Sequence, residues 1–356
     1  MKQQIVRSRK LQGGHGIIVG RFTKDGYRPP LLHRLLKPRQ SGNDINGLGE
    51  KAFRRPRPVY HFRETPNVSL PHKWIQQLFY SRMIRTKEFH DRIEERRYNI
   101  TRPLKPVADV RQHDTPRDFS RQVKQFALAH EADMVGIAQM RQEWVYDGFE
   151  IEQPWIIMLL VSHDYERLST APEYTANMEV LDQYNRGHRA GYELANWIRE
   201  RGYFAERYKG FLGTPITMIP PAIEVGFGEL GKHGSMINRK YGSNFRLSYV
   251  LTDMPLLADK RDEDVDVVND FCERCQVCTR ECPTNAISDQ KQIVRGEQKW
   301  YVNFDKCVPY FNDTYGCAVC IAVCPFSRPG AAESLIERLL KRRARQSADA
   351  PVAETE

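Results

Sequence analysis

The sequence of 356 residues has no long run of apolar residues. Its longest, Trp155 to Val161, is far shorter than the roughly 20 residues that a membrane-spanning helix needs, so we expect no transmembrane helix. The amino terminus begins Met-Lys-Gln-Gln and stays polar, with no apolar signal core and no paired arginines ahead of one. We therefore expect a cytoplasmic protein, in which grouped cysteines are metal ligands more often than disulfides.

Cysteine is absent outside one stretch, because all eight cysteines lie between Cys272 and Cys324. The first group reads Cys272-x2-Cys275-x2-Cys278-x3-Cys282-Pro283. This is the run of bacterial ferredoxins, in which three thiolates hold one [4Fe–4S] cluster and the fourth cysteine reaches a second cluster. The second group, Cys307-x9-Cys317-x2-Cys320-x3-Cys324-Pro325, keeps the last two spacings and stretches the first.

The interlocked groups predict two metal-binding sets. One set is Cys272, Cys275, Cys278 and Cys324, and the other is Cys282, Cys307, Cys317 and Cys320. Cys307 is the least secure ligand because of the nine-residue interval that follows it. Zinc and disulfides are the alternatives, but zinc sites usually group cysteine pairs as separate four-ligand sets. The array therefore predicts two [4Fe–4S] clusters and electron transfer, without specifying where the electrons go.

Charge is unevenly distributed along the chain. Residues 1–105 carry 24 Lys and Arg against eight Asp and Glu, a net +16, which leaves −7 for the remainder. Such a basic region can contact a membrane surface, a tRNA or an acidic electron donor. The alternative, which we favour, is a solvated and partly disordered arm. Within it, 71–98 is predicted to be helical, and packing on the next domain is favoured over lying on a membrane surface.

The pattern of apolar, turn-forming and charged residues along the rest of the chain predicts an α+β (α/β-like) fold in four parts. These are a basic, partly extended N-terminal region (1–105), a core (106–264), a ferredoxin-like domain (265–330) and a charged C-terminal tail (331–356), disordered from Arg342 onward. Asp114 or Thr115 is expected to cap a helix that has Pro116 in its first turn. Further elements are expected as strands over 133–138, 155–161, 203–208 and 245–252, and as a helix from about Tyr174 to Arg201 that ends at Gly202.

A glycine-rich stretch from Ile219 to Gly234 is the candidate for cofactor binding. Closely spaced glycines let a ligand approach the backbone, and exposed N–H groups suit an anionic group. The candidate residues are Gly226, Gly228, Glu229, Gly231, Lys232, His233 and Gly234. An ordinary turn is the alternative. The stretch has no Gly-x-Gly-x-x-Gly after a clear strand, so it does not indicate a nicotinamide site.

Taken together, several motifs give the chain a family resemblance over about residues 106–330. In chain order they are Ala132-Asp133-Met134-Val135-Gly136-Ile137, Trp144-Val145-Tyr146, Ile198-Arg199 before Gly202-Tyr203, Gly226-Phe227-Gly228-Glu229-Leu230-Gly231, Lys240-Tyr241-Gly242, Arg246-Leu247, Thr252-Asp253-Met254-Pro255-Leu256 and the double cysteine array with Tyr310. This order resembles the corrinoid-dependent reductive dehalogenases. It also resembles the related epoxyqueuosine reductases.

The resemblance implies a nitroreductase-like core that holds a base-off cobalamin, with one [4Fe–4S] cluster close to the corrin. It implies an oxidoreductase in which the clusters reduce the cobalt, and a tyrosine beside a cation delivers a proton. We predict Tyr184 as that tyrosine, Tyr192 as the second choice and Arg246 as the cation. A neighbouring cation is needed because a phenol with a pKa near 10 is a poor acid at neutral pH. Packing on an amphipathic helix is the alternative role for either tyrosine.

Three readings of function follow. The first is a cytoplasmic, non-respiratory dehalogenase that acts on a small organohalide and takes electrons from a reduced ferredoxin or flavodoxin, since no reductase domain follows the cysteines. The second is a tRNA epoxide reductase, which the basic region favours. Arg189 opposes it, because it stands where epoxyqueuosine reductases carry an acid in a Tyr-x-Arg-Gly-x-Asp motif. The third is a non-catalytic iron–sulfur electron carrier. The motifs do not specify the substrate.

Overall fold

An antiparallel four-stranded sheet forms the centre of the core in the computed structural model, which describes residues 20–23, 26–35, 40–60, 86–210, 215–261 and 267–348. The strands are β3 (Met134–Gln139), β4 (Trp155–Ser162), β5 (Ala205–Arg207) and β8 (Phe245–Thr252), in the order β3-β4-β8-β5. β4 lies in the middle with six consecutive buried residues, which explains its unbroken apolar sequence. These strands lie where the sequence predicted them.

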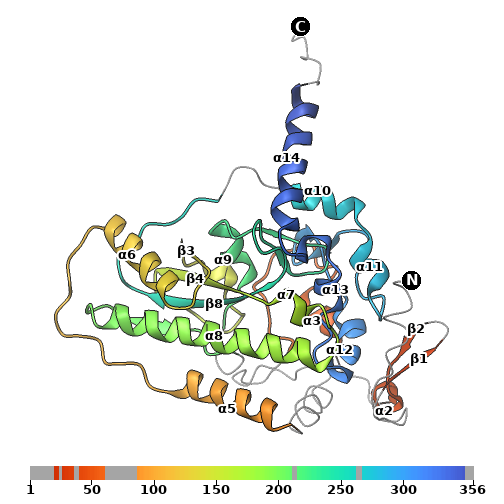
Figure 1. Cartoon of the computed structure of the whole chain (residues 1–356), viewed down its shortest axis with the longest axis horizontal. Helices are drawn as coiled ribbons and strands as arrows, with labels where there is room; N and C mark the ends of the chain where they lie inside the picture. Colours follow the sequence, from red (N-terminus) through yellow and green to blue (C-terminus); the bar gives the residue numbers. More distant parts are fainter. Residues whose placement is uncertain are drawn as a thin grey trace.

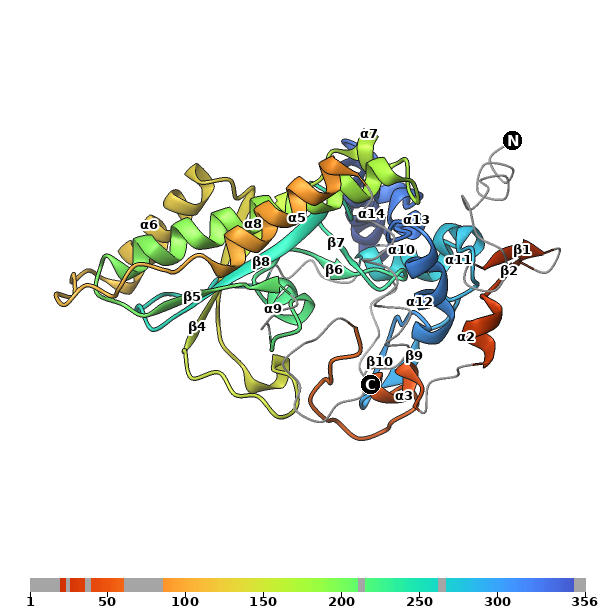
Figure 2. The same ribbon diagram turned by 90° about the horizontal axis from the view of Figure 1, so that it is seen from below.

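Helices α6 (Pro116–Ala129) and α8 (Tyr174–Arg199) pack on one face of this sheet (Figure 2). Thr115 begins α6 as predicted: its hydroxyl accepts a hydrogen bond from the Asp118 N–H (3.1 Å), and Pro116 occupies the first turn. Helix α5 (Lys87–Thr101) lies along α8 and buries Phe89 against it. The predicted helix over 71–98 is therefore described only from Lys87, and in that part it packs on the core as favoured.

The opposite face is covered by shorter elements. They include η1 (Gln142–Trp144), α9 (Ile219–Glu224), and the two-stranded pair β6 (Glu229–Leu230) and β7 (Met236–Ile237). Apolar side chains from β4 and β8, such as Met158 and Tyr249, pack there against Val225 and Phe227. The short helix α7 (Tyr165–Leu168) follows β4 and leads into α8. The glycine-rich stretch thus extends from the underside of the sheet toward the cysteine-containing region.

The cysteine-containing module follows the core in the sequence and packs against it. It comprises α10 (Val267–Arg274), α11 (Val277–Glu281), β9 (Gln292–Val294), β10 (Glu297–Lys299), α12 (Phe304–Asp313), α13 (Val319–Ala322) and η3 (Pro325–Ser327). At Gly242, φ is +57° and a Cβ would lie 1.9 Å from the Phe326 carbonyl oxygen, so only glycine allows this approach. The neighbouring Asn244 amide donates a hydrogen bond to the Ser327 carbonyl.

The segment after the module is a helix, which corrects the prediction of disorder for Arg342 to Ala348, whereas 349–356 lies outside the described residues. Helix α14 (Ala331–Ala348) buries Ala332 and Ile336 in an apolar cluster with α10 and η3. Leu335 and Leu339 lie partly buried at the edge of that cluster. Figure 1 shows α14 rising from the module, with its carboxyl-terminal half extending away from the rest of the ribbon.

The first elements of the basic N-terminal region, within residues 20–60, pack on the module, so this part is not the free arm that the composition favoured. They contain β1 (Arg21–Thr23), β2 (Gly26–Arg28), α2 (Leu31–Leu35) and α3 (Gly42–Asn46), beside α12 in Figure 1. Asn43 makes four of the polar contacts with the module. Its amide donates to Asn303 (3.1 Å) and Asp305 (3.0 Å), and its oxygen accepts from the Tyr301 hydroxyl (2.9 Å). These contacts have no periodicity that a sequence pattern could reveal.

The observed arrangement confirms the α+β class with the cysteine module in the carboxyl-terminal part. No helix in the described ranges is long and apolar enough to cross a bilayer.

Candidate functional site

The first predicted cysteine set lines one small cavity. Its walls are formed by Lys232, His233, Phe271, Cys272, Cys275, Cys278, Cys324, Pro325 and Phe326. Cys272, Cys278 and Cys324 are buried, whereas Cys275 is partly exposed. Burial raises the pKa of Cys272 to about 12 and that of Cys278 to about 11. These thiols are therefore neutral at pH 7 unless a metal replaces their protons, which is the chemistry of an iron–sulfur ligand set.

The second set also comes together, and it includes Cys307. Cys317 and Cys320 both lie within electrostatic range of Cys282 and Cys307. Burial, with the neighbouring Cys282 as a second cause, raises the pKa of Cys307 to about 12. The nine intervening residues complete α12 and then turn back at Cys317, whose φ is +44°. The stretched spacing thus accommodates a helix and still brings Cys307 to its predicted group. None of the eight cysteines forms a disulfide.

Lys232 and His233 lie against the first cysteine set. The Lys232 backbone N–H donates a hydrogen bond to Cys272, and its ammonium lies 4.7 Å from the centre of the Trp300 ring. His233 is held between two serines: Nδ1 accepts from the Ser235 N–H (3.2 Å), so Nε2 carries the proton toward the Ser243 hydroxyl (3.0 Å). Burial lowers the pKa of His233 to about 4, so the ring is neutral at pH 7.

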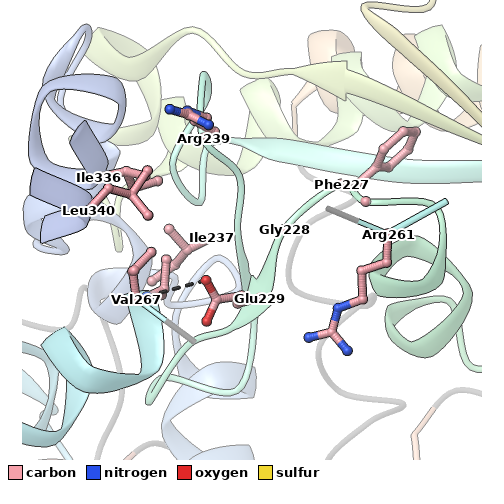
Figure 3. A pocket seen from close by; sticks show the side chains of 11 residues that line it. Phe227, Gly228, Glu229, Ile237, Arg239, Arg261, Val267, Ile336 and Leu340 are labelled. Carbon is pink, nitrogen blue, oxygen red and sulfur yellow. Dashed lines mark hydrogen bonds between the residues drawn. The ribbon is translucent and has the colours of Figure 1, made fainter. Parts of the chain in front are cut away.

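The other glycine-stretch candidates join the core to the module. Glu229 accepts from the Val268 and Asn269 N–H groups at the start of α10, each at 3.3 Å. Figure 3 shows the Glu229 carboxylate directed toward the start of this helix. A Cβ on Gly228 would lie 2.1 Å from the Ile237 carbonyl oxygen. Cβ atoms on the other two glycines would meet His233 (Gly231, 2.8 Å) and Val302 (Gly234, 2.9 Å).

A cavity of about 70 Å³ is lined by Gly226, Gly228 and Glu229 together with residues of α14. Ligand pockets are typically several hundred Å³, so this space is too small for a corrin ring. Glu229, His233 and three of the glycines already contact protein atoms, and a role of this stretch in cofactor binding stays a prediction.

Tyr184 and Arg246, predicted to act together, are neighbours. Tyr184 lies on α8 and is partly buried, and Arg246 on β8 places its guanidinium 4.9 Å from the centre of the phenol ring. Arg96 of α5 lies 4.6 Å from the same ring. Arg246 lowers the pKa of Tyr184 below the usual phenol value, and Arg96 adds to this, while burial opposes both. The arrangement makes Tyr184 a better proton donor than an ordinary tyrosine.

Two residues beside this phenol, His188 and Arg246, carry a buried polar atom without a partner. His188 stacks between the rings of Tyr184 and Tyr208, with ring centres at 6.5 and 5.1 Å. Within the described ranges, the His188 Nε2, the Arg246 Nε and the Ser248 hydroxyl are buried and have no hydrogen-bond partner. Such atoms are costly in a folded protein, so they fit a site in which a bound group supplies the missing partners.

Tyr192 is placed differently from Tyr184. Its hydroxyl donates to the Pro103 carbonyl at 3.2 Å, and its ring lies between Arg102 (3.4 Å) and Arg207 (5.1 Å). Arg189 forms ion pairs with Glu131 and Glu95 at the protein surface. Of the two predicted tyrosines, Tyr184 is the one brought to Arg246.

Sequence reasoning missed Arg96 and His188. Arg96 is one of several arginines in a charged helix, and nothing in its spacing distinguishes it from its neighbours. His188 follows Tyr184 by four residues in the stretch Tyr184-Asn185-Arg186-Gly187-His188. That spacing places both side chains on one helix face, so it was an available signal.

This geometry describes an iron–sulfur protein with an α+β core and a polarised phenol, and comparisons with known proteins agree. Residues 271–327 match the 4Fe-4S dicluster domain family. The tetrachloroethene reductive dehalogenase of Sulfurospirillum multivorans is 29% identical over 62% of this chain and 53% of its own length. The epoxyqueuosine reductase of Vibrio cholerae is 24% identical over 60% of this chain and 68% of its own length.

Solved structures show the same fold. A catabolic reductive dehalogenase in complex with 3-bromo-4-hydroxybenzoic acid matches with a TM-score of 0.69 at 19% identity, covering 88% of this chain and 48% of that one. A reductive dehalogenase with B12-dependent dehalogenation matches with a TM-score of 0.67 at 20% identity, covering 90% and 49%. The chain is a homologue of the reductive dehalogenases and the epoxyqueuosine reductases, and it spans about half the length of the dehalogenases.

Proposed function

We propose that this protein is an oxidoreductase that removes halide from a small organohalide, with two [4Fe–4S] clusters supplying the electrons and cobalamin as the reacting cofactor. The observation that carries the proposal is Tyr184, a partly buried phenol between the guanidiniums of Arg246 and Arg96. Reductive dehalogenation consumes two electrons and one proton for each carbon–halogen bond broken, and it releases one halide. The clusters account for the electrons and Tyr184 for the proton.

Cobalamin would supply a strongly reducing cobalt centre. The residues proposed to hold it or the substrate are Arg246 and His188, which have unpaired polar atoms beside Tyr184, and Ser248, which follows Arg246 on β8. The glycine stretch is not part of this proposal, because its polar groups already have protein partners. His233 in particular is engaged at both ring nitrogens.

The residues of this chain can deliver a proton without a rearrangement. Arg246 first, and Arg96 in addition, lower the pKa of Tyr184 below that of a free phenol, although burial opposes them. When the proton leaves, both guanidiniums stabilise the phenolate, which lowers the cost of the transfer. Burial of Tyr208 and His188 beside the ring keeps water away from this face. Burial together with Arg96 lowers the pKa of His188 to about 3, so this ring stays neutral.

Epoxyqueuosine reduction is the second candidate. It is favoured by the coverage of the Vibrio cholerae enzyme, of which the chain matches 68%. Arg189 opposes it, because this side chain is a cation paired with Glu131 and Glu95 and cannot act as the acid expected there.

The test is a comparison of the two activities in one anaerobic preparation. The protein is reconstituted with iron, sulfide and cobalamin, and reduced methyl viologen serves as the donor. We expect halide release from a bromophenol or an alkyl chloride, and no conversion of epoxyqueuosine in a tRNA stem-loop. Conversion of the tRNA without halide release would replace the first proposal by the second. Two clusters without bound cobalamin and without either activity would leave only an electron carrier.

A further inference from the structure

We propose that a small acidic electron carrier docks on an arginine-lined cavity between α10, α11 and α14 and delivers electrons through Cys275 to the first cluster. The inference rests on the proposed function only in requiring that the clusters receive electrons from outside. The cavity measures about 520 Å³. Its lining residues are Val267, Asp270, Phe271, Arg274, Cys275, Gln276, Val277, Arg280, Pro325, Leu339, Arg342, Arg343 and Gln346.

Cys275 lies between this cavity and the space that the first cysteine set encloses. It lines both the arginine-lined cavity and the space enclosed by the four cysteines, as do Phe271 and Pro325. The other three cysteines of the set, Cys272, Cys278 and Cys324, are buried, and Cys275 alone among them is partly exposed. Electron transfer slows steeply with distance, so a donor gains most by approaching a cluster at its least covered ligand. The cavity is where that approach is open.

Charge defines the kind of partner. Four of the lining side chains are arginines, against the single carboxylate of Asp270. Arg274, Arg280 and Arg342 are exposed, and Arg343 lies beside Arg342 on α14. A cavity lined by one sign of charge raises the encounter rate with partners of the opposite sign. An acidic protein surface is therefore the complement, and a basic or neutral donor would gain nothing here.

The shape of the cavity depends on α14. Its first half is anchored by Ala332 and Ile336 in the apolar cluster of the module, and its second half extends away with Arg342 and Arg343 on it. Leu339 lies at the junction, on the wall of the cavity. Helix α14 thus forms one wall of the arginine-lined cavity, and Cys275 of the first cysteine set forms another part of its lining.

The electron step balances without a further reactant. An anionic flavin hydroquinone of a flavodoxin gives up one electron and becomes the neutral semiquinone, so no proton is released. The oxidised [4Fe–4S] cluster takes up that electron. Two such encounters supply the two electrons that one turnover consumes.

The test uses the full chain with both clusters loaded and follows bleaching of the iron–sulfur absorbance by stopped flow. The donor is an acidic flavodoxin in its hydroquinone form. Arg342→Gln/Arg343→Gln removes two charges of the cavity, and Arg97→Gln/Arg117→Gln removes two exposed charges from α5 and α6. We expect the second-order rate at low ionic strength to fall about tenfold in the cavity variant and to stay within about twofold in the control variant. The rate of the unsubstituted protein should fall with added salt, and that of the cavity variant should fall less.

The outcomes separate this inference from the proposed function. Reduction by the methyl viologen radical, which is a cation, should be equal in both variants, and this shows that the clusters are intact. Equal loss of flavodoxin rate in both variants, or an unchanged rate in the cavity variant, would show that the donor docks elsewhere. Because bleaching is measured without any organohalide, a failure of dehalogenation leaves this result readable.

Discussion

Replacing Tyr184 by Phe removes the proposed proton donor and leaves the ring contacts in place. No described residue forms a hydrogen bond with the Tyr184 hydroxyl, and the ring stays between Arg96 at 4.6 Å and Arg246 at 4.9 Å. The free energy of unfolding should therefore change by less than about 1 kcal/mol. A positioned general acid contributes about 10²- to 10⁴-fold to a rate, which corresponds to about 3–5 kcal/mol on the barrier. We expect kcat to fall by that factor while cobalamin content is unchanged.

The assay is halide release with reduced methyl viologen as donor, together with cobalt content and thermal unfolding of each variant. Tyr192→Phe is the matched comparison, because it also removes one hydroxyl from α8. That hydroxyl donates to the Pro103 carbonyl, so its loss should cost about 1 kcal/mol of stability and little activity. If Tyr184→Phe keeps more than a tenth of the activity, or if Tyr192→Phe loses as much, the assignment of the proton donor is wrong.

The pH dependence gives a second check on the same pair, and three further predictions concern other features. Arg246 lowers the pKa of Tyr184, so Arg246→Gln should move the alkaline limb of the pH–rate profile to higher pH; an unmoved limb would exclude this coupling. Burial, with Arg96 second, lowers the pKa of His188 to about 3. The unfolded chain therefore takes up the proton first as pH falls below about 6.5, and stability declines. Urea unfolding should show that His188→Gln loses about 1 kcal/mol less than the unsubstituted protein between pH 7.5 and 5.5; equal losses would contradict the neutral buried ring. Cys307→Ala should lower iron content by about half, and full iron content would remove Cys307 from the ligand set. Gly242→Ala should destabilise the protein by about 2–3 kcal/mol in thermal unfolding, because its Cβ would meet the Phe326 carbonyl; an unchanged midpoint would refute the close approach.

The sequence predicted best where one physical rule dominates. The strand Trp155 to Val161 was found because its apolar run is short and unbroken, and Thr115 with Pro116 was found because a cap and a first-turn proline coincide. The grouping of the cysteines followed from ferredoxin spacing alone. Even Cys307 lies with its predicted set, because the nine-residue interval contains the end of α12.

Prediction was weaker where a residue's role depends on what approaches it in space. Glu229 stood in a glycine-rich stretch and was predicted to contact a cofactor, whereas its carboxylate lies at the start of α10. Glycine density indicates close approach but does not identify the approaching group. The helix after residue 330 was missed although Ile336, Leu339 and Leu340 follow helical spacing, because its high charge suggested disorder. Asn43 gave no signal, since a single polar residue that reaches across the chain has no pattern.

The position of Asn43 also constrains how the protein is made. Its amide bonds to Asp305 across 262 positions of the sequence, so the segment that carries it emerges from the ribosome long before its partner exists. Contacts of this range form late, after the intervening chain has folded. The cysteine module must consequently be synthesised before the N-terminal segment can close over it.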